Sequence, residues 1–282
     1  MRLYTFDRNG QPCVGVQRDD KLIALPQFSD MLTLIRGGTD ALSSARATLE
    51  QSDATGYPIA QVRCYAPIPQ PGKVLCSGIN YHSHFQENPN AKIPESPFFF
   101  AKLPNAVIGT GQPIVHPKAT RQLDYEVEFA VVIGRTLHHV PESEVMSGIF
   151  GYTVLHDVSA RDVQFRDNQI TLGKNFDGFA PIGPCIVTAD EIPHPETLRL
   201  RSYVNGQLMQ DGSNADWVFS LPRLISALAD VMTLQPGDVI STGTPSGVGL
   251  FRKPPVFLKP GDRVVVEVES IGRLENPIIE KS

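Results

Sequence analysis

Beyond residue 73 the chain consists mainly of short β-type segments, and this pattern limits the folds open to it most strongly. The segments are rich in Val, Ile, Phe, Tyr and Thr, and most are bounded by Gly, Pro, Asn or Asp. They cover residues 73–76, 98–101, 125–133, 151–157, 185–188, 198–204, 238–242 and 263–268. One convincing amphipathic helix, residues 222–232, stands among them. The pattern predicts a β-rich sandwich, roll or barrel rather than a parallel α/β sheet.

The first 64 residues have a different character. Three β-type runs (2–6, 13–17 and 21–24) precede a stretch of helix formers at 28–51, which Gly37-Gly38 divides into two short helices. Residues 65–73 then carry three prolines and a glycine, as a linker would. We therefore predict a mostly β, α+β protein with a small N-terminal α+β domain (1–64) and a main domain (65–282).

Composition narrows the range of partners. A net charge of −5 gives no support for binding to nucleic acid or to an anionic membrane. The four cysteines are far apart and form no CxxC pair, which favours free thiols in a reducing compartment. No signal peptide is apparent, and the apolar runs are shorter than the roughly 20 residues that cross a bilayer. These features predict a cytoplasmic protein without nucleic-acid or membrane partners.

The segment 124–133 carries acids at alternate positions, so that Asp124, Glu126 and Glu128 share one face of a strand. Three like charges on one face repel each other, and either water or a cation must relieve them. Asp157 ends the segment 151–157 and opens into a polar loop. A carboxylate at a strand end beside a pair of carboxylates suits an oxygen-ligand site for Mg²⁺ or Mn²⁺. A water-exposed face remains the alternative.

Three further stretches are candidates for chemistry. His84 and Glu87 are three residues apart, so one helical turn would place them side by side, with the carboxylate orienting a general base. Lys174 lies in a turn-rich stretch, where it could stabilise an enolate or carboxylate near a metal. The Gly-rich turn at 242–249 follows a strand, and its N–H groups could bind a carboxylate. Their alternatives are an incidental His–Glu pair, a surface lysine and an ordinary tight turn.

Together these residues resemble the fumarylacetoacetate hydrolase family. The resemblance covers about residues 65–280 and rests on five motifs in the family's order. They are Asn80-Tyr81-x-x-His84-x-x-Glu87, Asp124-Tyr125-Glu126-x-Glu128, His156-Asp157-Val-Ser-Ala-Arg161-Asp162 with Gln164, Gly173-Lys174-x-Phe-Asp177 and Thr242-Gly-Thr244-Pro-x-Gly-Val-Gly249. The resemblance implies a mixed β-sandwich roll, usually a homodimer.

The resemblance also implies roles for individual residues. Glu126, Glu128 and Asp157 match the family's ligands for Mg²⁺ or Mn²⁺, whereas Asp124 matches none. By the same resemblance, His84 and Glu87 are the catalytic dyad and Lys174 stabilises developing negative charge. Contacts to substrate are expected from Gln164, Thr244 and Arg161.

Two departures from the family pattern leave the substrate open. Residues 76–78 offer no fourth metal carboxylate of the kind that larger members carry. Ile170 stands where many members have Trp.

The leading hypothesis is hydrolysis of a C–C bond in a 2,4-dioxo acid such as an acylpyruvate. In it, a metal chelates the 2-oxo acid and His84 activates water. The alternative is decarboxylation or enol–keto tautomerisation of oxaloacetate at the same site, and a third hypothesis is a non-catalytic binding protein, which the intact dyad and Lys174 oppose.

Overall fold

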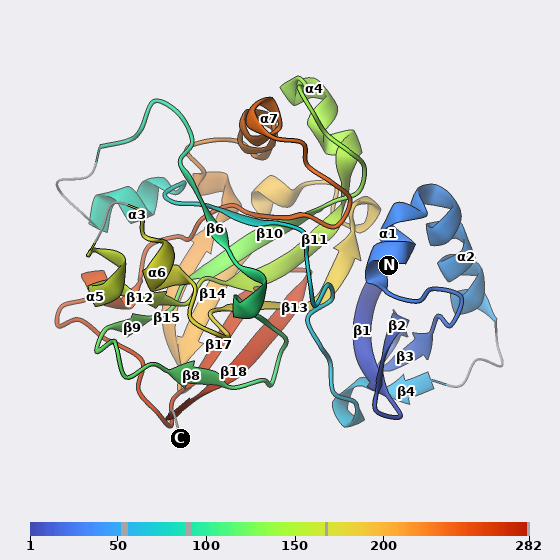
Figure 1. Ribbon diagram of the computed structural model, residues 1–282, viewed down its shortest axis with the longest axis horizontal. Coiled ribbons are helices and arrows are strands. Elements are labelled where there is room, and N and C mark those ends of the chain that lie inside the picture. The colour runs from blue at the N-terminus through green and yellow to red at the C-terminus, as the bar shows by residue number, and fades with distance from the viewer. Residues whose placement is uncertain (52–55, 88–91, 167–168, 281–282) are drawn as a thin grey trace.

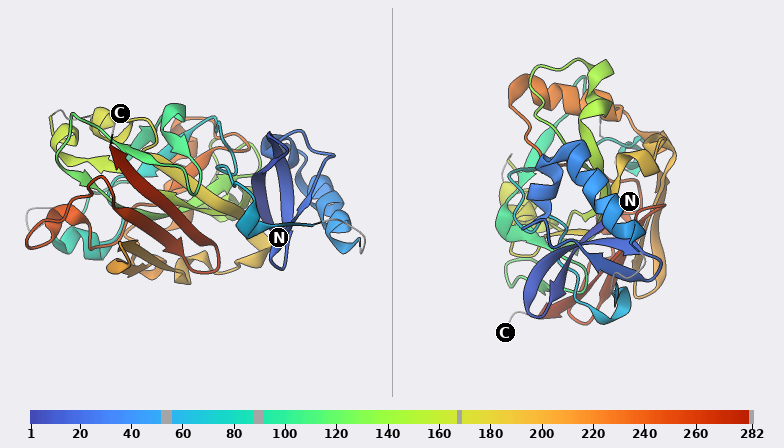
Figure 2. Two further views of the ribbon diagram at one scale, coloured as in Figure 1. Left: turned by 90° about the horizontal axis from the view of Figure 1, so that it is seen from below. Right: turned by 90° about the vertical axis from the view of Figure 1, so that its right-hand side faces the viewer.

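The computed structural model describes residues 1–51, 56–87, 92–166 and 169–280. The N-terminal part forms a meander with two helices packed on it, at one end of the molecule (Figures 1 and 2). Its elements are β1 (Arg2–Arg8), β2 (Gln11–Arg18), β3 (Lys21–Ala24), α1 (Met31–Arg36), α2 (Gly38–Glu50) and β4 (Gly56–Pro58). The helix break predicted at Gly37-Gly38 is confirmed, since Gly37 ends α1 and Gly38 has a φ of 56°.

A central mixed sheet carries the strands that position the candidate site. Its strands run in the order β4-β3-β2-β1-β13-β11-β10-β16-β5-β6, with β7 pairing β13. Those beyond the N-terminal part are β5 (Val74–Ser77), β6 (Phe99–Lys102), β7 (Val107–Ile108), β10 (Val127–Ile133), β11 (Ile149–His156), β13 (Ala180–Thr188) and β16 (Val239–Ser241). Because β1 pairs with β13, the N-terminal strands extend this sheet, and the domain boundary near residue 65 stays a prediction.

A second sheet packs against the central one. It has the order β15-β14-β17-β18-β8, formed by β8 (Ile114–His116), β14 (Arg199–Val204), β15 (Gln207–Ser213), β17 (Arg263–Val268) and β18 (Gly272–Glu280). Phe129 and Val131 of β10 share one buried cluster with Leu200 of β14 and Val266 of β17. The two sheets therefore enclose the main core, as a sandwich does.

The other face of the central sheet has its own core. Met31, Leu34 and Ile35 of α1 lie in a buried cluster that also includes Ala130 and Val132 of β10. The two β10 residues in this cluster, Ala130 and Val132, lie in the middle and second half of the strand. Glu126 and Glu128 point to the same face but precede them in the chain and lie outside the cluster. The acids are thus placed at one end of a buried sheet face rather than on the outside.

The remaining helices lie at the edges of the sheets. The predicted helix at 222–232 is confirmed as α7 (Leu221–Val231), which Ser220 caps by accepting the Arg223 N–H and which packs beside α4 (Glu142–Val145). Three short helices, α3 (His82–Glu87), α5 (Arg161–Gln164) and α6 (Thr171–Lys174), lie at the end of the molecule away from the N-terminal helices (Figure 1). A separate two-stranded ladder pairs β9 (Leu123–Asp124) with β12 (Ser159–Ala160), and β12 leads directly into α5.

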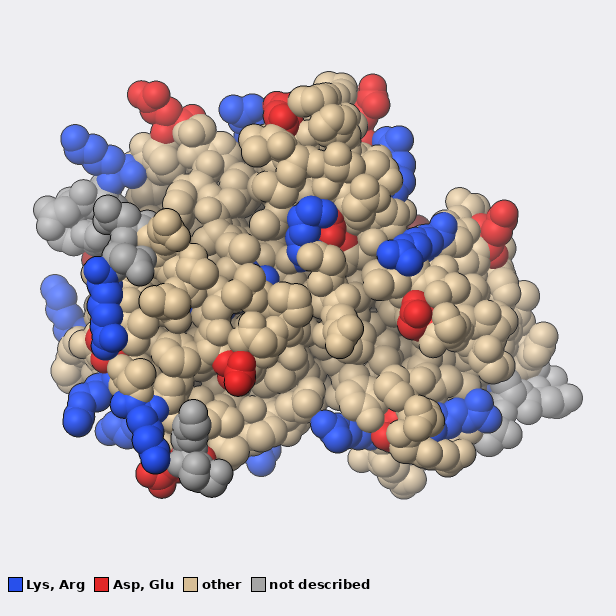
Figure 3. Space-filling model, viewed as in Figure 1, with Lys and Arg blue, Asp and Glu red and all other residues tan. Residues whose placement is uncertain are grey.

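The architecture confirms the predicted mostly β, α+β class, and each segment predicted as a strand overlaps one. No helix among the described residues is both long and apolar enough to cross a bilayer. On the face seen in Figure 3, charged side chains of both signs are dispersed, most of them near the edges.

Candidate active site

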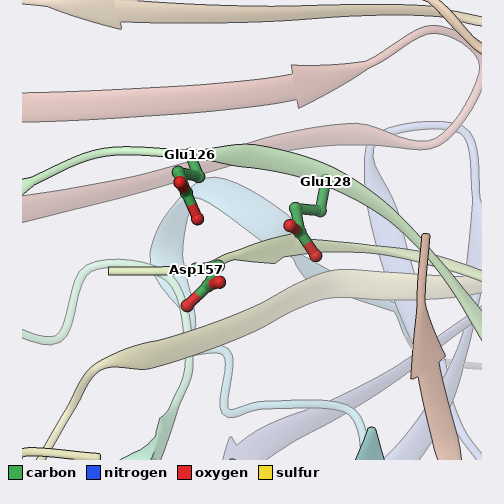
Figure 4. Close-up of side chains that lie close together, drawn as sticks. All are labelled: Glu126, Glu128 and Asp157. Carbon is green, nitrogen blue, oxygen red and sulfur yellow. The ribbon is translucent and has the colours of Figure 1, made fainter. Parts of the chain in front are cut away.

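The three predicted metal carboxylates lie together. β10 and β11 are antiparallel with Val127 opposite His156, so Glu126 and Asp157 face each other just beyond the paired residues. The Asp157 N–H donates to the Glu126 carbonyl at 3.0 Å. One carboxylate oxygen from each of Glu126, Glu128 and Asp157 lies within 4.8 Å of the others, and the three side chains converge (Figure 4). The strand pairing thus assembles the triad.

The water-exposed alternative for the acidic face is wrong. Glu126, Glu128 and Asp157 are 4%, 1% and 0% exposed. The segment is also not one continuous strand, because Tyr125 and Glu126 leave the ladder between β9 and β10. The Val127 N–H instead donates to the side chain of Gln210 at 3.0 Å. The carboxylates are therefore held in the interior, where their charges need compensation.

Two cations of the chain compensate part of this charge. Lys174 Nζ lies 2.8 Å from Glu126 and 2.5 Å from Asp157, and Arg161 Nη2 lies 2.5 Å from Glu126. Burial opposes ionisation of Glu126, but Arg161 and Lys174 prevail and hold its pKa well below the usual range. Burial likewise acts against Lys174, yet Asp157 and Glu126 raise its pKa, so Lys174 stays protonated. Its role is that of a fixed positive charge.

Glu128 stands apart from this network. It forms no ion pair within the part of the chain that the structure describes, and its one side-chain partner there is the Ser241 hydroxyl, which donates to it. Burial, with Asp157 and Glu126 adding repulsion, raises the pKa of Glu128 well above its usual range. Glu128 is therefore the carboxylate of the triad whose charge no lysine or arginine of the described residues compensates directly.

The residues present fit a hard divalent cation. Three converging carboxylates are the oxygen donors that Mg²⁺ and Mn²⁺ prefer. When all the acids are ionised, four buried carboxylates face three buried cations and one negative charge is in excess: Asp124, Glu126, Glu128 and Asp157 against Lys102, Arg161 and Lys174. A divalent cation would reverse that excess and make the site attractive to an anionic substrate.

Lys102 is the site residue that the sequence analysis missed. It follows the apolar run of β6 and is 2% exposed. Its ammonium lies 2.5 Å from Asp157 Oδ1 and donates to three backbone carbonyls, those of Val158, Lys174 and Phe179, at 2.8–3.0 Å. The available signal was the lysine that directly follows the apolar run of residues 98–101. Lys102 fixes both Asp157 and the backbone of Lys174.

We expect Lys102→Met to lower the free energy of unfolding by about 3–5 kcal/mol, because Asp157 keeps only one of its two buried cations and three buried carbonyls lose their donor. Urea denaturation of the metal-free protein measures this. Lys118→Met, at an exposed lysine, should change stability by less than about 0.5 kcal/mol. Equal stability of the two variants would show that Lys102 is not needed to hold the cluster.

His84 and Glu87 lie side by side on α3, as their spacing predicted. His84 Nδ1 lies 2.7 Å from Glu87 Oε2, and the other oxygen of Glu87 accepts the Gly247 N–H at 2.7 Å. The carboxylate is thereby clamped between the imidazole and the Gly-rich turn, which fixes the ring orientation. The catalytic roles of His84 and Glu87 stay predictions at this point.

The Gly-rich turn at 242–249 does bind carboxylates, but they belong to the chain itself. Besides Glu87, it holds Asp124, which accepts the N–H groups of Gly249 at 2.7 Å and Leu250 at 3.0 Å and pairs with Arg161 at 2.9 Å. A Cβ on Gly249 would lie 1.9 Å from the Val256 carbonyl, so only glycine allows this approach. Asp124 therefore anchors Arg161, which explains why an acid lies at this position beside Glu126.

Thr244 lies in the same turn, yet its hydroxyl is engaged in the fold. It donates to the Val127 carbonyl at 2.8 Å and accepts from Gln210 at 2.8 Å, with 2% of the residue exposed. A contact between Thr244 and substrate stays a prediction. Arg161 and Gln164 lie 3.2 Å apart, Nη1 to Oε1, and both line the cavity described next.

A cavity of about 210 Å³ extends from His84 of the dyad to Glu126 of the triad. Polar residues line one part of it: His84, Glu126, Arg161, Gln164 and Lys174. Gly78 and apolar side chains line the rest: Ile79, Phe85, Phe98, Phe100, Phe165, Ile170, Leu250 and Phe251. Lys174 Nζ also lies 4.9 Å from the centre of the Phe100 ring, a favourable cation–π distance. The arrangement can hold a small anion between the His84 imidazole and the Lys174 ammonium.

Comparisons with known proteins agree with this geometry. The model of the fumarylacetoacetate (FAA) hydrolase C-terminal family matches residues 73–279. The mitochondrial oxaloacetate tautomerase Fahd2a of Rattus norvegicus is 43% identical over 91% of this chain and 81% of its own length. Oxaloacetate tautomerase YisK of Bacillus subtilis is 44% identical over 79% and 75%.

A solved structure extends the similarity to the whole chain. Maleylpyruvate hydrolase from Sphingobium sp. SYK-6, in complex with manganese(II) and pyruvate, is 31% identical with a TM-score of 0.85 over 100% of both chains. Family model, relatives and fold thus agree: this chain belongs to the fumarylacetoacetate hydrolase family of enzymes.

Proposed function

We propose that this protein is a divalent-metal-dependent enzyme that interconverts the enol and keto forms of a 2-oxo acid, with oxaloacetate as the first substrate to test. The observation that carries the proposal is that His84, Lys174 and Glu126 line one small cavity, with Glu87 bonded to His84 and with Glu128 and Asp157 grouped around Glu126. Tautomerisation needs a group that moves a proton at carbon and a positive charge that stabilises the enolate oxygen, and the cavity offers both.

The chain's own residues account for the proton transfer. His84, with Nδ1 held by Glu87, presents its other ring nitrogen for the proton at C3 of the substrate. Lys174, kept protonated by Glu126 and Asp157, supplies positive charge for the oxygen at C2. A cation held by Glu126, Glu128 and Asp157 would supply Lewis-acid polarisation of the carboxylate and 2-oxo group.

Tautomerisation ranks first because it needs nothing beyond these groups. Hydrolysis adds an attacking water and a cleaved bond to the same proton transfer. The two relatives described above, at 43% and 44% identity, are named oxaloacetate tautomerases, which supports the reaction that ranked second on sequence alone.

The test is the decay of enol absorbance of oxaloacetate with purified protein and Mg²⁺ or Mn²⁺. We expect a rate well above that of buffer with the same metal, and removal of metal by a chelator should abolish the difference. An unchanged enol decay with metal-loaded, folded protein would contradict the proposal.

Hydrolysis of a 2,4-dioxo acid such as an acylpyruvate is the second candidate. The fold similarity to a maleylpyruvate hydrolase favours it, and a His–Glu pair suits activation of water. Incubation with acylpyruvate and detection of pyruvate tests this candidate separately, because tautomerisation alone releases no pyruvate.

A further inference from the structure

The cavity has two unlike ends, and the apolar end has no part in the proton transfer described above. Phe98 and Phe165 stand at its mouth with 49% and 64% of their surface exposed. Phe98 lies directly on Gly78, where a Cβ would approach the ring to 2.3 Å. Glycine at this position therefore lets an aromatic ring form part of the wall. Exposed apolar side chains gathered at a cavity usually mark a binding surface.

The basic groups that line the cavity all have carboxylate partners within the chain. Arg161 is bonded to Asp124 and Glu126, Lys174 to Glu126 and Asp157, and His84 to Glu87. Among the lining residues, none of the cations is free for a second carboxylate on the substrate's remote end. A carboxylate placed there would be desolvated against phenylalanine and isoleucine without a counter-charge from the described residues that line the cavity.

Ile170 adds an independent sign that the apolar wall is built for a ligand. It has a φ of 55° and ψ of −7°, a left-handed conformation that is rare and costly for a β-branched residue. Its side chain lines the cavity beside Lys174, in the turn that leads into α6. Strain of this kind persists where the surrounding structure imposes it, and it concentrates at binding sites.

We propose that the preferred substrate is the enol of a 2-oxo acid whose C3 carries a bulky apolar group, an aryl- or branched alkylpyruvate, and that Ile170 sets this preference. The inference rests on the proposed tautomerase reaction and names its substrate class. The 2-oxo acid end lies at the polar residues, and the C3 substituent lies against Ile170, Phe98 and Phe165. The enol oxygen loses one proton to solvent, C3 gains one proton from His84, and His84 recovers its proton from solvent, so the reaction is an isomerisation with no change of oxidation state.

The experiment compares the enols of phenylpyruvate and oxaloacetate with the metal-loaded enzyme. We expect kcat/KM for enol-phenylpyruvate to exceed that for enol-oxaloacetate by about tenfold or more, the discrimination that one good apolar contact provides. Equal or faster turnover of oxaloacetate overturns this inference and leaves the tautomerase proposal standing. Turnover of neither enol overturns both.

Ile170→Asn tests the residue itself, because asparagine tolerates the left-handed conformation and removes the apolar surface. It should lower the ratio of kcat/KM for enol-phenylpyruvate to kcat/KM for enol-oxaloacetate about tenfold. Leu172→Asn is the matched control, since Leu172 is 66% exposed in the same segment and does not line the cavity. An equal loss for both substrates in Ile170→Asn, or the same loss in Leu172→Asn, would assign Ile170 a structural role only.

Discussion

Glu128→Gln should remove metal binding and turnover while leaving a folded and more stable metal-free protein. Glutamine keeps the shape of Glu128 and removes one of three converging carboxylates. Loss of even an outer partner of a metal ligand commonly weakens affinity 10–100-fold, so we expect more than about 100-fold here. Titration calorimetry with Mn²⁺ measures the affinity, and urea denaturation with a chelator measures the stability.

The stability gain should depend on pH in a defined direction. The folded-state pKa of Glu128 is raised, so its protonated form favours folding at low pH and this contribution is lost as pH rises through the folded pKa. Glutamine does not ionise, so Glu128→Gln does not lose stability in this way as the pH rises. The advantage of Glu128→Gln over the unaltered protein should therefore be present at pH 7 and shrink on acidification.

Glu126→Gln is the matched contrast. Glu126 is paired with Arg161 and Lys174, so its replacement leaves two buried cations short of a partner. We expect this variant to lose metal affinity and also about 3–5 kcal/mol of stability. A Glu128→Gln protein that binds Mn²⁺ as tightly as the unaltered chain would contradict the metal site, and equal stability of the two variants would contradict the distinct roles given to Glu126 and Glu128.

His84→Ala should lower kcat for enol-oxaloacetate about 10²–10⁴-fold, the usual contribution of a positioned general acid or base. Metal affinity should hardly change, since His84 is bonded to Glu87 rather than to the triad. Stopped-flow absorbance gives the rate, and calorimetry with Mn²⁺ supplies the control. Full activity of His84→Ala would exclude His84 as the proton-transfer group.

Glu87→Gln separates orientation from proton transfer. The amide can still accept from Gly247 but cannot hold a protonated imidazole as a carboxylate does. We expect a smaller decrease in kcat than in His84→Ala, together with a changed pH–rate profile. An unchanged profile would show that Glu87 serves only to fix α3.

Local sequence patterns were sufficient for much of this site. Alternation placed Tyr125, Val127 and Phe129 in the core and the acids on the opposite face, as the structure has them. The three-residue spacing of His84 and Glu87 likewise predicted their contact on α3. Both are short-range properties that one strand or one helical turn determines.

What escaped prediction depends on contacts between distant parts of the chain. Lys102 reaches Asp157 only because β6 and β11 belong to one sheet, and the Gly-rich turn meets Glu87 across 160 residues. Strand β18, which contains Pro277 and alternates charged with apolar residues, was absent from the predicted segments, although it pairs with β17 and β8. On sequence alone, only water or a metal ion was considered as the means of relieving the repulsion between the acids. Lys174 and Arg161 also compensate their charge, and they reach Glu126 only through contacts between distant parts of the chain.

The most direct test of the central claim is the metal dependence of enol-oxaloacetate decay in the unaltered protein and in Glu128→Gln, measured side by side after chelation and after return of Mg²⁺ or Mn²⁺. The account predicts that both chelated proteins are inactive and that metal restores only the unaltered one, although Glu128→Gln is fully folded. Metal-independent decay by the unaltered protein, or full recovery of Glu128→Gln, would contradict it.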